Sequence, residues 1–223
     1  MKNYTDITIL LDRSGSMATI QDQMEKSFDE FITAHKVNPS TRVTLIEFDS
    51  VNSQNVVFQN VPVTSVEPLK LKPRGWTPLL DAFCTAIDTT GNRLASMDES
   101  ERPNKVIFIA ITDGQENSST WAKRSDVKKR ITHQHDTYKW EFVYLGANQD
   151  AYSEAATFGI ARTSAMTYSH DTIGTASAMR SLTANTVAYA NNQSLSTAFN
   201  KAQQDEAEEN IKKAWKIDTT MTK

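Results

Sequence analysis

The most continuous apolar stretch of the chain is Val-Ile-Phe-Ile-Ala-Ile at residues 106–111. A short run that is apolar at every position is typical of a strand buried on both faces, as the central strands of parallel sheets are. Other apolar runs at residues 7–11, 43–48 and 141–145 predict further strands. Because amphipathic helical patterns lie between these runs, the sequence predicts an α/β domain with a doubly wound, mostly parallel sheet flanked by helices.

The apolar stretches at residues 56–58 and 61–63 are short, and the second contains Pro62. Proline cannot donate a hydrogen bond to a neighbouring strand, so it is tolerated mainly at the edge of a sheet. We therefore expect a hairpin at this place, which would add one antiparallel edge strand to the sheet.

The composition of the chain changes near residue 191. Residues 191–194 are Asn-Asn-Gln-Ser, which is typical of a linker, and residues 199–217 are strongly charged with apolar residues at loosely helical spacing. We therefore expect an α/β domain at residues 1–190, followed at residues 191–223 by a polar linker and a charged helix. The sequence leaves open whether this helix packs on the domain or projects toward a partner.

Composition restricts the classes of protein to which the chain can belong. With 39% hydrophobic and 23% charged residues, the 223 residues have the profile of a globular protein. The formal net charge of −3 argues against nucleic-acid binding, which usually depends on a basic surface. Cys84 is the single cysteine, which fits a reducing compartment. No apolar run approaches the roughly 18 residues that span a bilayer, so we expect a cytoplasmic protein without a membrane partner.

Residues with oxygen donors follow two of the predicted strands. Asp12, Ser14 and Ser16 come directly after the strand at residues 7–11, and Asp113 follows the longest apolar run. In a doubly wound sheet, ligands bind at the carboxyl ends of the strands, beside the switch in strand order. Hard oxygen donors without His or Cys suit Mg²⁺, Mn²⁺ or Ca²⁺ better than Zn²⁺ or Cu²⁺. The sequence therefore predicts a divalent-metal site if these segments converge.

Thr77 is a third candidate ligand, in the loop sequence Gly-Trp-Thr-Pro-Leu at residues 75–79. Thr followed by Pro also opens helices, with the threonine as the cap and the proline in the first turn. The simpler interpretation is therefore that Ser14, Ser16 and Thr77 are helix caps and that Asp113 is a turn residue. The order of these residues along the chain, each at the boundary of a predicted element, favours the metal site.

Residues 12–16, 75–79 and 112–114 together resemble the metal-ion-dependent adhesion site of the von Willebrand factor A family. The resemblance covers roughly residues 4–190, and it implies the Rossmann-like fold of that family. The stretch Leu-Gly-Ala-Asn-Gln-Asp-Ala at residues 145–151 also resembles stand-alone bacterial and phage members. This second likeness implies a microbial source. For a phage-encoded protein, the expected location is the cytoplasm of the host.

The resemblance implies a role for each of the five site residues. The hydroxyls of Ser14 and Ser16 would bind Mg²⁺ directly, and Thr77 would bind it directly or through water. Asp12 and Asp113 would act mainly through water or by hydrogen bonds to the ligands. Because the direct ligands are then mostly neutral, the ion keeps positive charge and an open position for an Asp or Glu of a partner protein. The implied function is a Mg²⁺-dependent adaptor without catalysis, with Mn²⁺ or Ca²⁺ as alternative ions.

Three residues beside the motifs are expected to form a partner-binding rim: Arg13, Trp76 and Glu116. The position before Thr77 is often small in the family, so Trp76 is a departure from its pattern. A large aromatic residue there would either contact the partner or pack beneath the loop, and the sequence leaves both open. Glu116 would either pair with the partner or compete for the metal.

Two other classes of function compete with the adaptor: a metal-dependent hydrolase or phosphatase, and a nucleotide-binding protein. A phosphoaspartyl phosphatase would need a second carboxylate two residues after its nucleophile, where this chain has Ser14. The four histidines lie away from the motif loops in the sequence, and no glycine-rich nucleotide fingerprint follows the first strand. These absences favour the adaptor, and the oligomeric state is left open.

Overall fold

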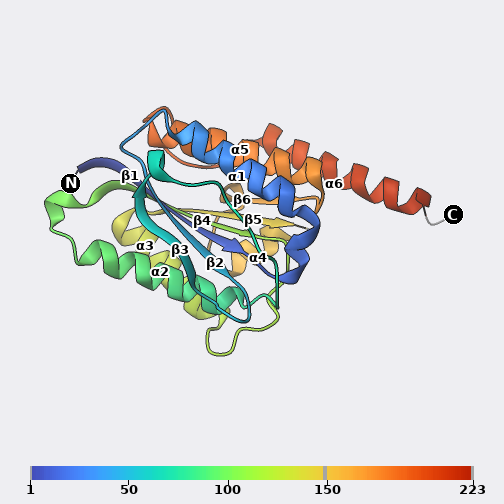
Figure 1. The fold of residues 1–223 in the computed structure, drawn as a ribbon, viewed down its shortest axis with the longest axis horizontal. Coiled ribbons are helices and arrows are strands. Elements are labelled where there is room, and N and C mark those ends of the chain that lie inside the picture. The colour runs from blue at the N-terminus through green and yellow to red at the C-terminus, as the bar shows by residue number, and fades with distance from the viewer. Residues whose placement is uncertain (1, 148–149, 222–223) are drawn as a thin grey trace.

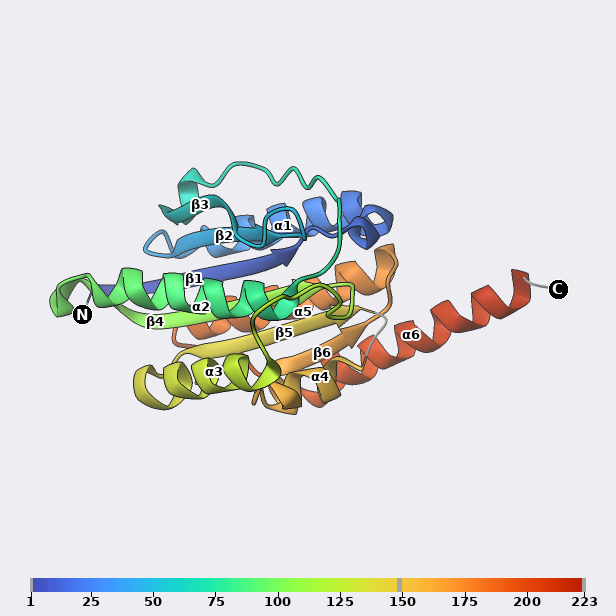
Figure 2. The same cartoon turned by 90° about the horizontal axis from the view of Figure 1, so that it is seen from below.

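The computed structural model describes residues 2–147 and 150–221, which form a sheet with helices on both faces (Figures 1 and 2). The elements are β1 (Lys2–Asp12), α1 (Gln21–His35), β2 (Arg42–Phe48), β3 (Asn55–Pro62), α2 (Leu79–Ala95), β4 (Pro103–Thr112), α3 (Arg124–Tyr138), β5 (Glu141–Ala147), α4 (Ala151–Thr157), β6 (Ala165–Tyr168), α5 (Thr172–Ala190) and α6 (Lys201–Met221). None of the helices within these residues is both long enough and apolar enough to cross a membrane.

The sheet has six strands in the order β3-β2-β1-β4-β5-β6. Neighbouring strands are parallel except for β3, which runs antiparallel to β2 at the edge. This architecture confirms the predicted doubly wound α/β fold with one antiparallel edge strand. The strand order changes direction between β1 and β4, so the carboxyl ends of these two strands form the switch point where ligands bind in such sheets.

The expected hairpin at the sheet edge is wrong. Residues 56–58 and 61–63 do not pair with each other, because residues 55–62 are one strand that pairs with β2. Asn60, between the two stretches, has a positive φ of 51°, and the pairing register shifts on both sides of Leu45. The side chain of Asn60 accepts a hydrogen bond of 2.7 Å from Arg42 Nε. The irregularity is therefore absorbed as a bulge within one strand, where the sequence suggested a turn.

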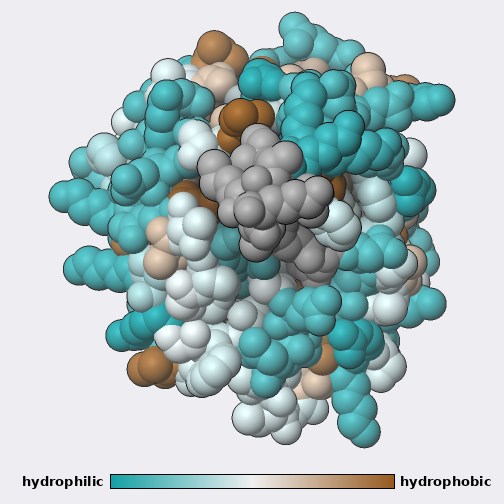
Figure 3. Space-filling view, turned by 90° about the vertical axis from the view of Figure 1, so that its right-hand side faces the viewer, coloured by the Kyte–Doolittle hydropathy of each residue, from teal (hydrophilic) through white to brown (hydrophobic). Residues whose placement is uncertain are grey.

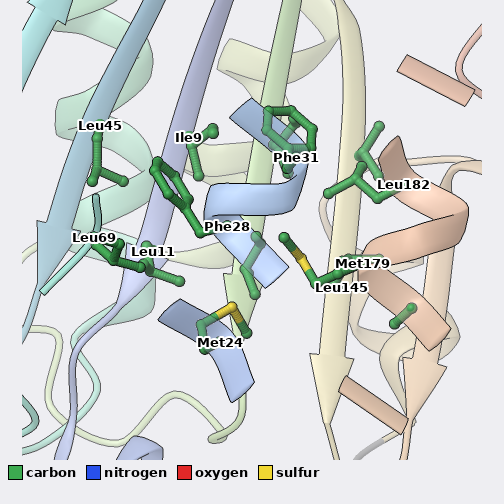
Figure 4. Close-up of a cluster of buried hydrophobic side chains, with 14 of the residues drawn as sticks. Ile9, Leu11, Met24, Phe28, Phe31, Leu45, Leu69, Leu145, Met179 and Leu182 are labelled. Carbon is green, nitrogen blue, oxygen red and sulfur yellow. The ribbon is translucent and has the colours of Figure 1, made fainter. Parts of the chain in front are cut away.

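One face of the sheet is covered by α1 and α5. In α1, Met24, Phe28 and Phe31 recur at spacings of three and four and are all buried, because these spacings place side chains on one helix face. Figure 4 shows Phe28 and Phe31 lying against Ile9 of β1, with Met179 of α5 alongside. This packing fixes the position of β1, whose last residue is Asp12.

The other face is covered by α2, α3 and α4 around a group of aromatic rings. The ring of Phe83 in α2 lies 5.8 Å from that of Phe108, 6.4 Å from that of Tyr144 and 5.3 Å from that of Phe158, centre to centre. Aromatic pairs at these separations add to the stabilisation from burial. Both faces of β4 and β5 are therefore covered, which explains why residues 106–111 are apolar throughout.

The first half of α6 packs on the domain, against β6 and α5. Phe199 and Ala207 are buried and belong to the same core as α1, and Phe199 N donates to Thr163 O at 2.7 Å. The rest of the helix projects beyond the domain (Figures 1 and 2), where Trp215 is 71% exposed. The first half of the helix therefore docks on the domain, and contact of its second half with a partner stays a prediction. Core residues from both sides of residue 190 pack together. The domain boundary predicted at that residue stays a prediction.

Candidate metal site

Asp12 is the last residue of β1, and its side chain bridges two strand ends. Its Oδ1 accepts from Ser14 N at 2.7 Å, and its Oδ2 accepts from Thr112 Oγ1, at the end of β4, at 2.6 Å. The residue is 0% exposed. Burial raises the pKa of this carboxyl to about 7, and the nearby charge of Asp113 adds to this, while the hydrogen bonds from Thr112 and Ser14 act against it. A buried carboxylate with this environment is costly to ionise without a cation.

The two serine hydroxyls lie side by side next to Asp113. Ser14 Oγ and Ser16 Oγ are 3.1 Å apart, and Ser16 Oγ donates to Asp113 Oδ1 at 2.7 Å. The segment after Ser14 begins as a 3-10 turn at Gly15–Ile20 and becomes α-helical at Gln21. The tight turn immediately after Ser14 holds both hydroxyls near the end of β4.

Backbone hydrogen bonds join the loop before α2 to the loop after β1. Gly15 N donates to Gly75 O at 3.1 Å, and Arg74 N donates to Arg13 O at 2.8 Å. Gly75 has a φ of +70°, and a Cβ there would lie only 2.6 Å from Ser50 Oγ. Glycine is therefore required at this position, because another residue would be strained and would collide with Ser50.

The loop after β4 brings Gly114 close to the hydroxyls of Thr77 and Ser16. A Cβ built on Gly114 would lie 3.0 Å from Thr77 Oγ1 and 3.7 Å from Ser16 Oγ, so both hydroxyls border the same small volume. Thr77 is 2% exposed. The structure therefore brings together all five predicted site residues, from three segments far apart in the sequence.

The donors that meet here fit a hard divalent cation. Among the described residues, no group of three or more His, Cys, Asp or Glu side chains is arranged to hold a metal, so hydroxyl groups have to contribute. Around an ion with bonds of about 2.1 Å, neighbouring octahedral ligands lie about 3 Å apart. The spacing of 3.1 Å between the two serine oxygens agrees with this value.

Asp49 is a further buried carboxylate at this end of the sheet, and it is absent from the site residues predicted from the sequence. Its Oδ2 accepts from Arg13 Nε at 2.8 Å and from Arg74 Nε at 2.9 Å. Its Oδ1 accepts from the backbone of Val51 at 2.7 Å and of Asn52 at 2.8 Å. Burial alone would raise the pKa of Asp49, but these hydrogen bonds, that from Arg74 foremost, outweigh burial and lower it. The signal that could have found it is an aspartate directly after a predicted strand.

The structure places Arg13 inside the protein, where the expectation was the partner-binding rim. Its residue is 7% exposed, and its guanidinium contacts Glu47 at 2.9 Å as well as Asp49. The backbone of Arg13 also donates to Phe48 O at 2.9 Å, which keeps the residue beside the end of β2. Arg13 therefore stabilises the loops and is not presented to a partner.

Glu116 is also engaged within the protein. Its Oε1 accepts from Ser118 N at 2.9 Å and Ser119 N at 2.7 Å, and its Oε2 accepts from Leu80 N at 2.9 Å. Glu116 thus caps the first turn of α2, a role that the sequence suggested for Thr77. Both carboxylate oxygens of Glu116 are thus already engaged within the protein, which argues against both roles expected for it.

Trp76 lies on the surface beside Thr77. It is 67% exposed, and its backbone N–H donates to Ser50 Oγ at 2.9 Å. This exposure excludes packing beneath the loop, the second of the two interpretations left open by the sequence. Contact of Trp76 with a partner stays a prediction.

His170 reaches the site from the connection between β6 and α5, although the histidines were expected to lie away from it. Its Nε2 is 2.9 Å from Asp113 Oδ2. Tyr168, two residues earlier, is fully buried, and burial together with the charges of Asp113 and Asp12 raises the pKa of its hydroxyl, which stays neutral. Nothing local in the sequence indicates this approach, because it depends on where β6 lies in the sheet.

No protein-family model matches this sequence, and no curated protein matches it either. Three solved structures have similar folds. Proximal thread matrix protein 1 from the mussel byssus has a TM-score of 0.57 and 15% identity over 82% of this chain and 46% of its own. A von Willebrand factor type A protein from Catenulispora acidiphila has a TM-score of 0.53 and 16% identity over 82% and 42%. The pilus adhesin SpaC from Lactobacillus rhamnosus GG has a TM-score of 0.60 and 14% identity over 82% and 30%.

This chain therefore spans less than half of the length of each of these three proteins. Another structure of the mussel protein is described as having a zinc-occupied MIDAS motif, the metal-ion-dependent adhesion site. The stretch at residues 145–151 that resembles bacterial and phage members includes residues 148 and 149, which lie outside the described residues. At these levels of identity the likeness establishes the fold, which is of the von Willebrand factor A type.

Proposed function

We propose that this protein is a metal-dependent protein-binding module that recognises an acidic side chain of a partner protein. The observation that carries this proposal is the convergence of the hydroxyls of Ser14, Ser16 and Thr77 with the carboxylates of Asp12 and Asp113. These are the five residues that the resemblance to the adhesion site singled out. In this proposal Ser14, Ser16 and Thr77 hold the ion, and Asp12 and Asp113 orient its shell.

The charge of the donor set supports recognition of a carboxylate. The direct ligands would be neutral hydroxyls, and Asp12 accepts its two hydrogen bonds from neutral donors, Ser14 N and Thr112 Oγ1. An ion held in this way keeps net positive charge, and a negative side chain is attracted to it. Ser16 is exposed to solvent while Asp12 is fully buried, so the site is open on the serine side.

Oxygen donors favour Mg²⁺, with Mn²⁺ and Ca²⁺ as alternatives. Mg²⁺ keeps several waters in protein sites, so a bound ion offers positions that a partner's oxygen can take over. The zinc in the mussel protein supports a divalent ion at this type of site in that protein. We propose Mg²⁺ for this chain because the five predicted site residues offer only hydroxyl and carboxylate oxygens.

The surface around the site supports contact with a folded protein. Figure 3 views the end of the molecule toward which β1 and β6 point in Figure 2, and shows a largely hydrophilic face with a few separate hydrophobic residues. Trp76 and Ile173, from the loops before α2 and at the start of α5, are 67% and 69% exposed. Exposed large side chains beside a charged centre are suited to anchoring a partner.

We further propose that the module acts by binding, without turnover, and in the cytoplasm. The basis for the compartment is the single cysteine, Cys84, which is buried and offers no disulfide. Two arms of one experiment separate binding from catalysis. A binding module is supported if the protein captures a partner in Mg²⁺ but not in EDTA, and hydrolyses no phosphate ester in Mg²⁺. Hydrolysis that disappears with Asp12→Ala would support the hydrolase instead.

The central test is affinity capture from a lysate, in Mg²⁺ and again in EDTA, with wild type and Asp12→Ala. We expect a protein that is retained by wild type only in Mg²⁺, and is not retained by Asp12→Ala in either condition. Asp126→Ala is the matched control, because Asp126, in the first turn of α3, likewise accepts a backbone hydrogen bond, from Lys123 N at 2.9 Å. Capture by Asp12→Ala equal to that by wild type would overturn the proposal.

A further inference from the structure

His170 and Asp113 meet across the carboxyl edge of the sheet. His170 follows β6 and Asp113 follows β4, and β5 lies between these strands. His170 Nε2 is 2.9 Å from Asp113 Oδ2, and the two side chains are 16% and 0% exposed. A carboxylate oxygen that is fully buried needs a donor, because burial removes the water that would otherwise hydrogen-bond to it. Asp113 Oδ2 accepts no hydrogen bond in the present geometry of the described residues, and the imidazole lies close enough to supply one after a small rotation of its ring.

The two oxygens of Asp113 face different partners. Oδ1 accepts from Ser16 Oγ at 2.7 Å, on the side where the hydroxyls converge, and Oδ2 faces His170. His170 thus contacts a different oxygen of Asp113 from the one that Ser16 contacts, and a bond at that oxygen would restrict the rotation of the carboxylate.

The backbone around His170 is fixed by the start of α5. Asp171 N donates to Ser169 O at 2.9 Å, and Asp171 Oδ1 accepts from Gly174 N at 2.7 Å, which caps the helix. A Cβ on Gly174 would overlap with Ser169, so this turn admits only glycine. His170 is therefore presented from a rigid turn, as a side chain that positions another residue has to be.

We propose that His170 is a positioning residue of the metal site: its Nε2–H holds Asp113 Oδ2, so that Oδ1 points toward Ser16 and the ion. This inference rests on the metal site of the proposed function and extends it to a residue outside the three motif segments. Ligating carboxylates are commonly oriented by outer hydrogen bonds, and removal of such a partner typically weakens metal binding about 10- to 100-fold.

The test is isothermal titration calorimetry of Mn²⁺ into chelator-stripped wild type, His170→Ala and His170→Gln. We expect His170→Ala to weaken Mn²⁺ binding about 10- to 100-fold. The Gln side chain can place an amide N–H near the position of Nε2, so His170→Gln should recover most of that loss. Equal affinity of wild type and His170→Ala, or no recovery in His170→Gln, would overturn the positioning role.

His35→Ala is the matched control for loss of stability alone. His35 lies on helix α1, is buried, and has a side-chain hydrogen bond of 3.0 Å to Thr186 Oγ1, far from the site. It should lower the unfolding temperature at least as much as His170→Ala while leaving Mn²⁺ affinity unchanged. If His35→Ala weakens Mn²⁺ binding to the same extent, the effect of His170 is one of stability only, and the proposal fails.

Two further outcomes separate this inference from its alternatives. Electron paramagnetic resonance of the Mn²⁺-loaded wild type should show no coupling to a directly bound nitrogen, and such a coupling would make His170 a ligand and overturn the positioning role. Wild type that binds no Mn²⁺, Mg²⁺ or Ca²⁺ would overturn the proposed function together with this inference. Normal metal binding by both wild type and His170→Ala would overturn this inference alone.

Discussion

Asp12 and Asp49 are equally buried carboxylates at neighbouring strand ends, but their surroundings are opposite. Each is 0% exposed, and they follow the cores of β1 and β2, which pair in parallel. Asp49 contacts the guanidinium groups of Arg13 and Arg74, whereas Asp12 accepts hydrogen bonds from a backbone amide and a threonine hydroxyl. The pKa of Asp49 is lowered and that of Asp12 is raised to about 7.

The difference between these surroundings shows how a carboxylate with a structural role can be told from one that is proposed to act beside a bound cation. The protein neutralises Asp49 with its own arginines, so this residue ties together the loops after β1, β2 and before α2. Asp12 is buried beside Asp113 with neutral donors, which fits the proposal that an ion from outside balances its charge. A strongly perturbed carboxylate at a strand end is accordingly a mark of a functional site.

The largest expected effect on stability comes from Asp49→Ala. Removal of this carboxylate leaves the buried guanidinium of Arg13 without one of its two acidic partners, and breaking a buried pair costs about 4 kcal/mol. Denaturant unfolding followed by circular dichroism measures the change. Asp88→Ala is the control, because Asp88 pairs with Arg130 on the surface, where such pairs contribute less than about 1 kcal/mol. Equal losses in the two variants would contradict the structural role of Asp49.

The next largest effect is a dependence of stability on pH. It comes from His35, at the far end of α1 from the candidate metal site. Thr186 Oγ1 donates to Leu182 O at 2.8 Å, so it accepts from His35 Nε2–H, and His35 is held neutral. Burial lowers the pKa of His35 from 6.5 to about 4. The unfolded chain therefore takes up the proton first as the pH falls, and stability is full above pH 6.5 and is lost between pH 6.5 and about 4.

Such a shift corresponds to about 3 kcal/mol over that window. The measurement is the free energy of unfolding of the chelator-stripped protein at a series of pH values, in wild type and in His35→Gln. The variant keeps an N–H donor for Thr186 but cannot titrate, so its unfolding free energy should fall less across the window. Identical pH profiles would show that His35 does not control the loss of stability in acid.

Stabilisation of the folded protein by bound metal tests the difference between Asp12 and Asp49 directly. At a free Mg²⁺ concentration about 100 times the dissociation constant, binding to the folded state raises the unfolding free energy by about 2.7 kcal/mol. We expect this increase in wild type and in Asp49→Ala, measured against the starting stability of each, and none in Asp12→Ala. Stabilisation of Asp12→Ala to the same extent as wild type would remove the distinction between the two carboxylates.

The smallest effect is expected for Trp76→Ala. This variant tests the contact of the partner-binding rim with a partner, and does not test metal binding. Truncation of an exposed aromatic anchor typically lowers partner affinity by about tenfold or more, while metal affinity should not change. Trp121→Ala is the control, because Trp121 is 54% exposed and its ring faces Arg130 on α3. Equal losses of partner affinity in both variants would argue against a specific contact by Trp76.

The strand ends and their acidic residues were predictable from the sequence. An apolar run that stops at a polar residue marks both the end of a buried strand and the position of its last side chain, which is why Asp12 and Asp113 could be found. The same signal is present at Asp49, but no second motif accompanies it to mark a site. The form of the edge strand β3 could not be predicted, because Asn60 and Pro62 indicate a turn as well as they indicate a bulge.

The directions of long side chains could not be predicted. Arg13 turns inward because Glu47 and Asp49 lie there, at the end of a neighbouring strand, and Glu116 turns toward the first turn of α2. His170 reaches Asp113 only because the strand order places the end of β6 near that of β4. Each of these contacts joins segments that are distant in the sequence, so local patterns carry no sign of them.

The most direct test of the metal site is a calorimetric titration of Mg²⁺ and Mn²⁺ into the chelator-stripped protein, with wild type and Asp12→Ala side by side. We predict one saturable site per chain in wild type, and binding that is at least about 100-fold weaker in Asp12→Ala, at the strong end of the losses seen when groups around a metal are removed. Absence of binding in wild type, or equal binding in both proteins, would contradict a metal site at Asp12, Ser14, Ser16, Thr77 and Asp113.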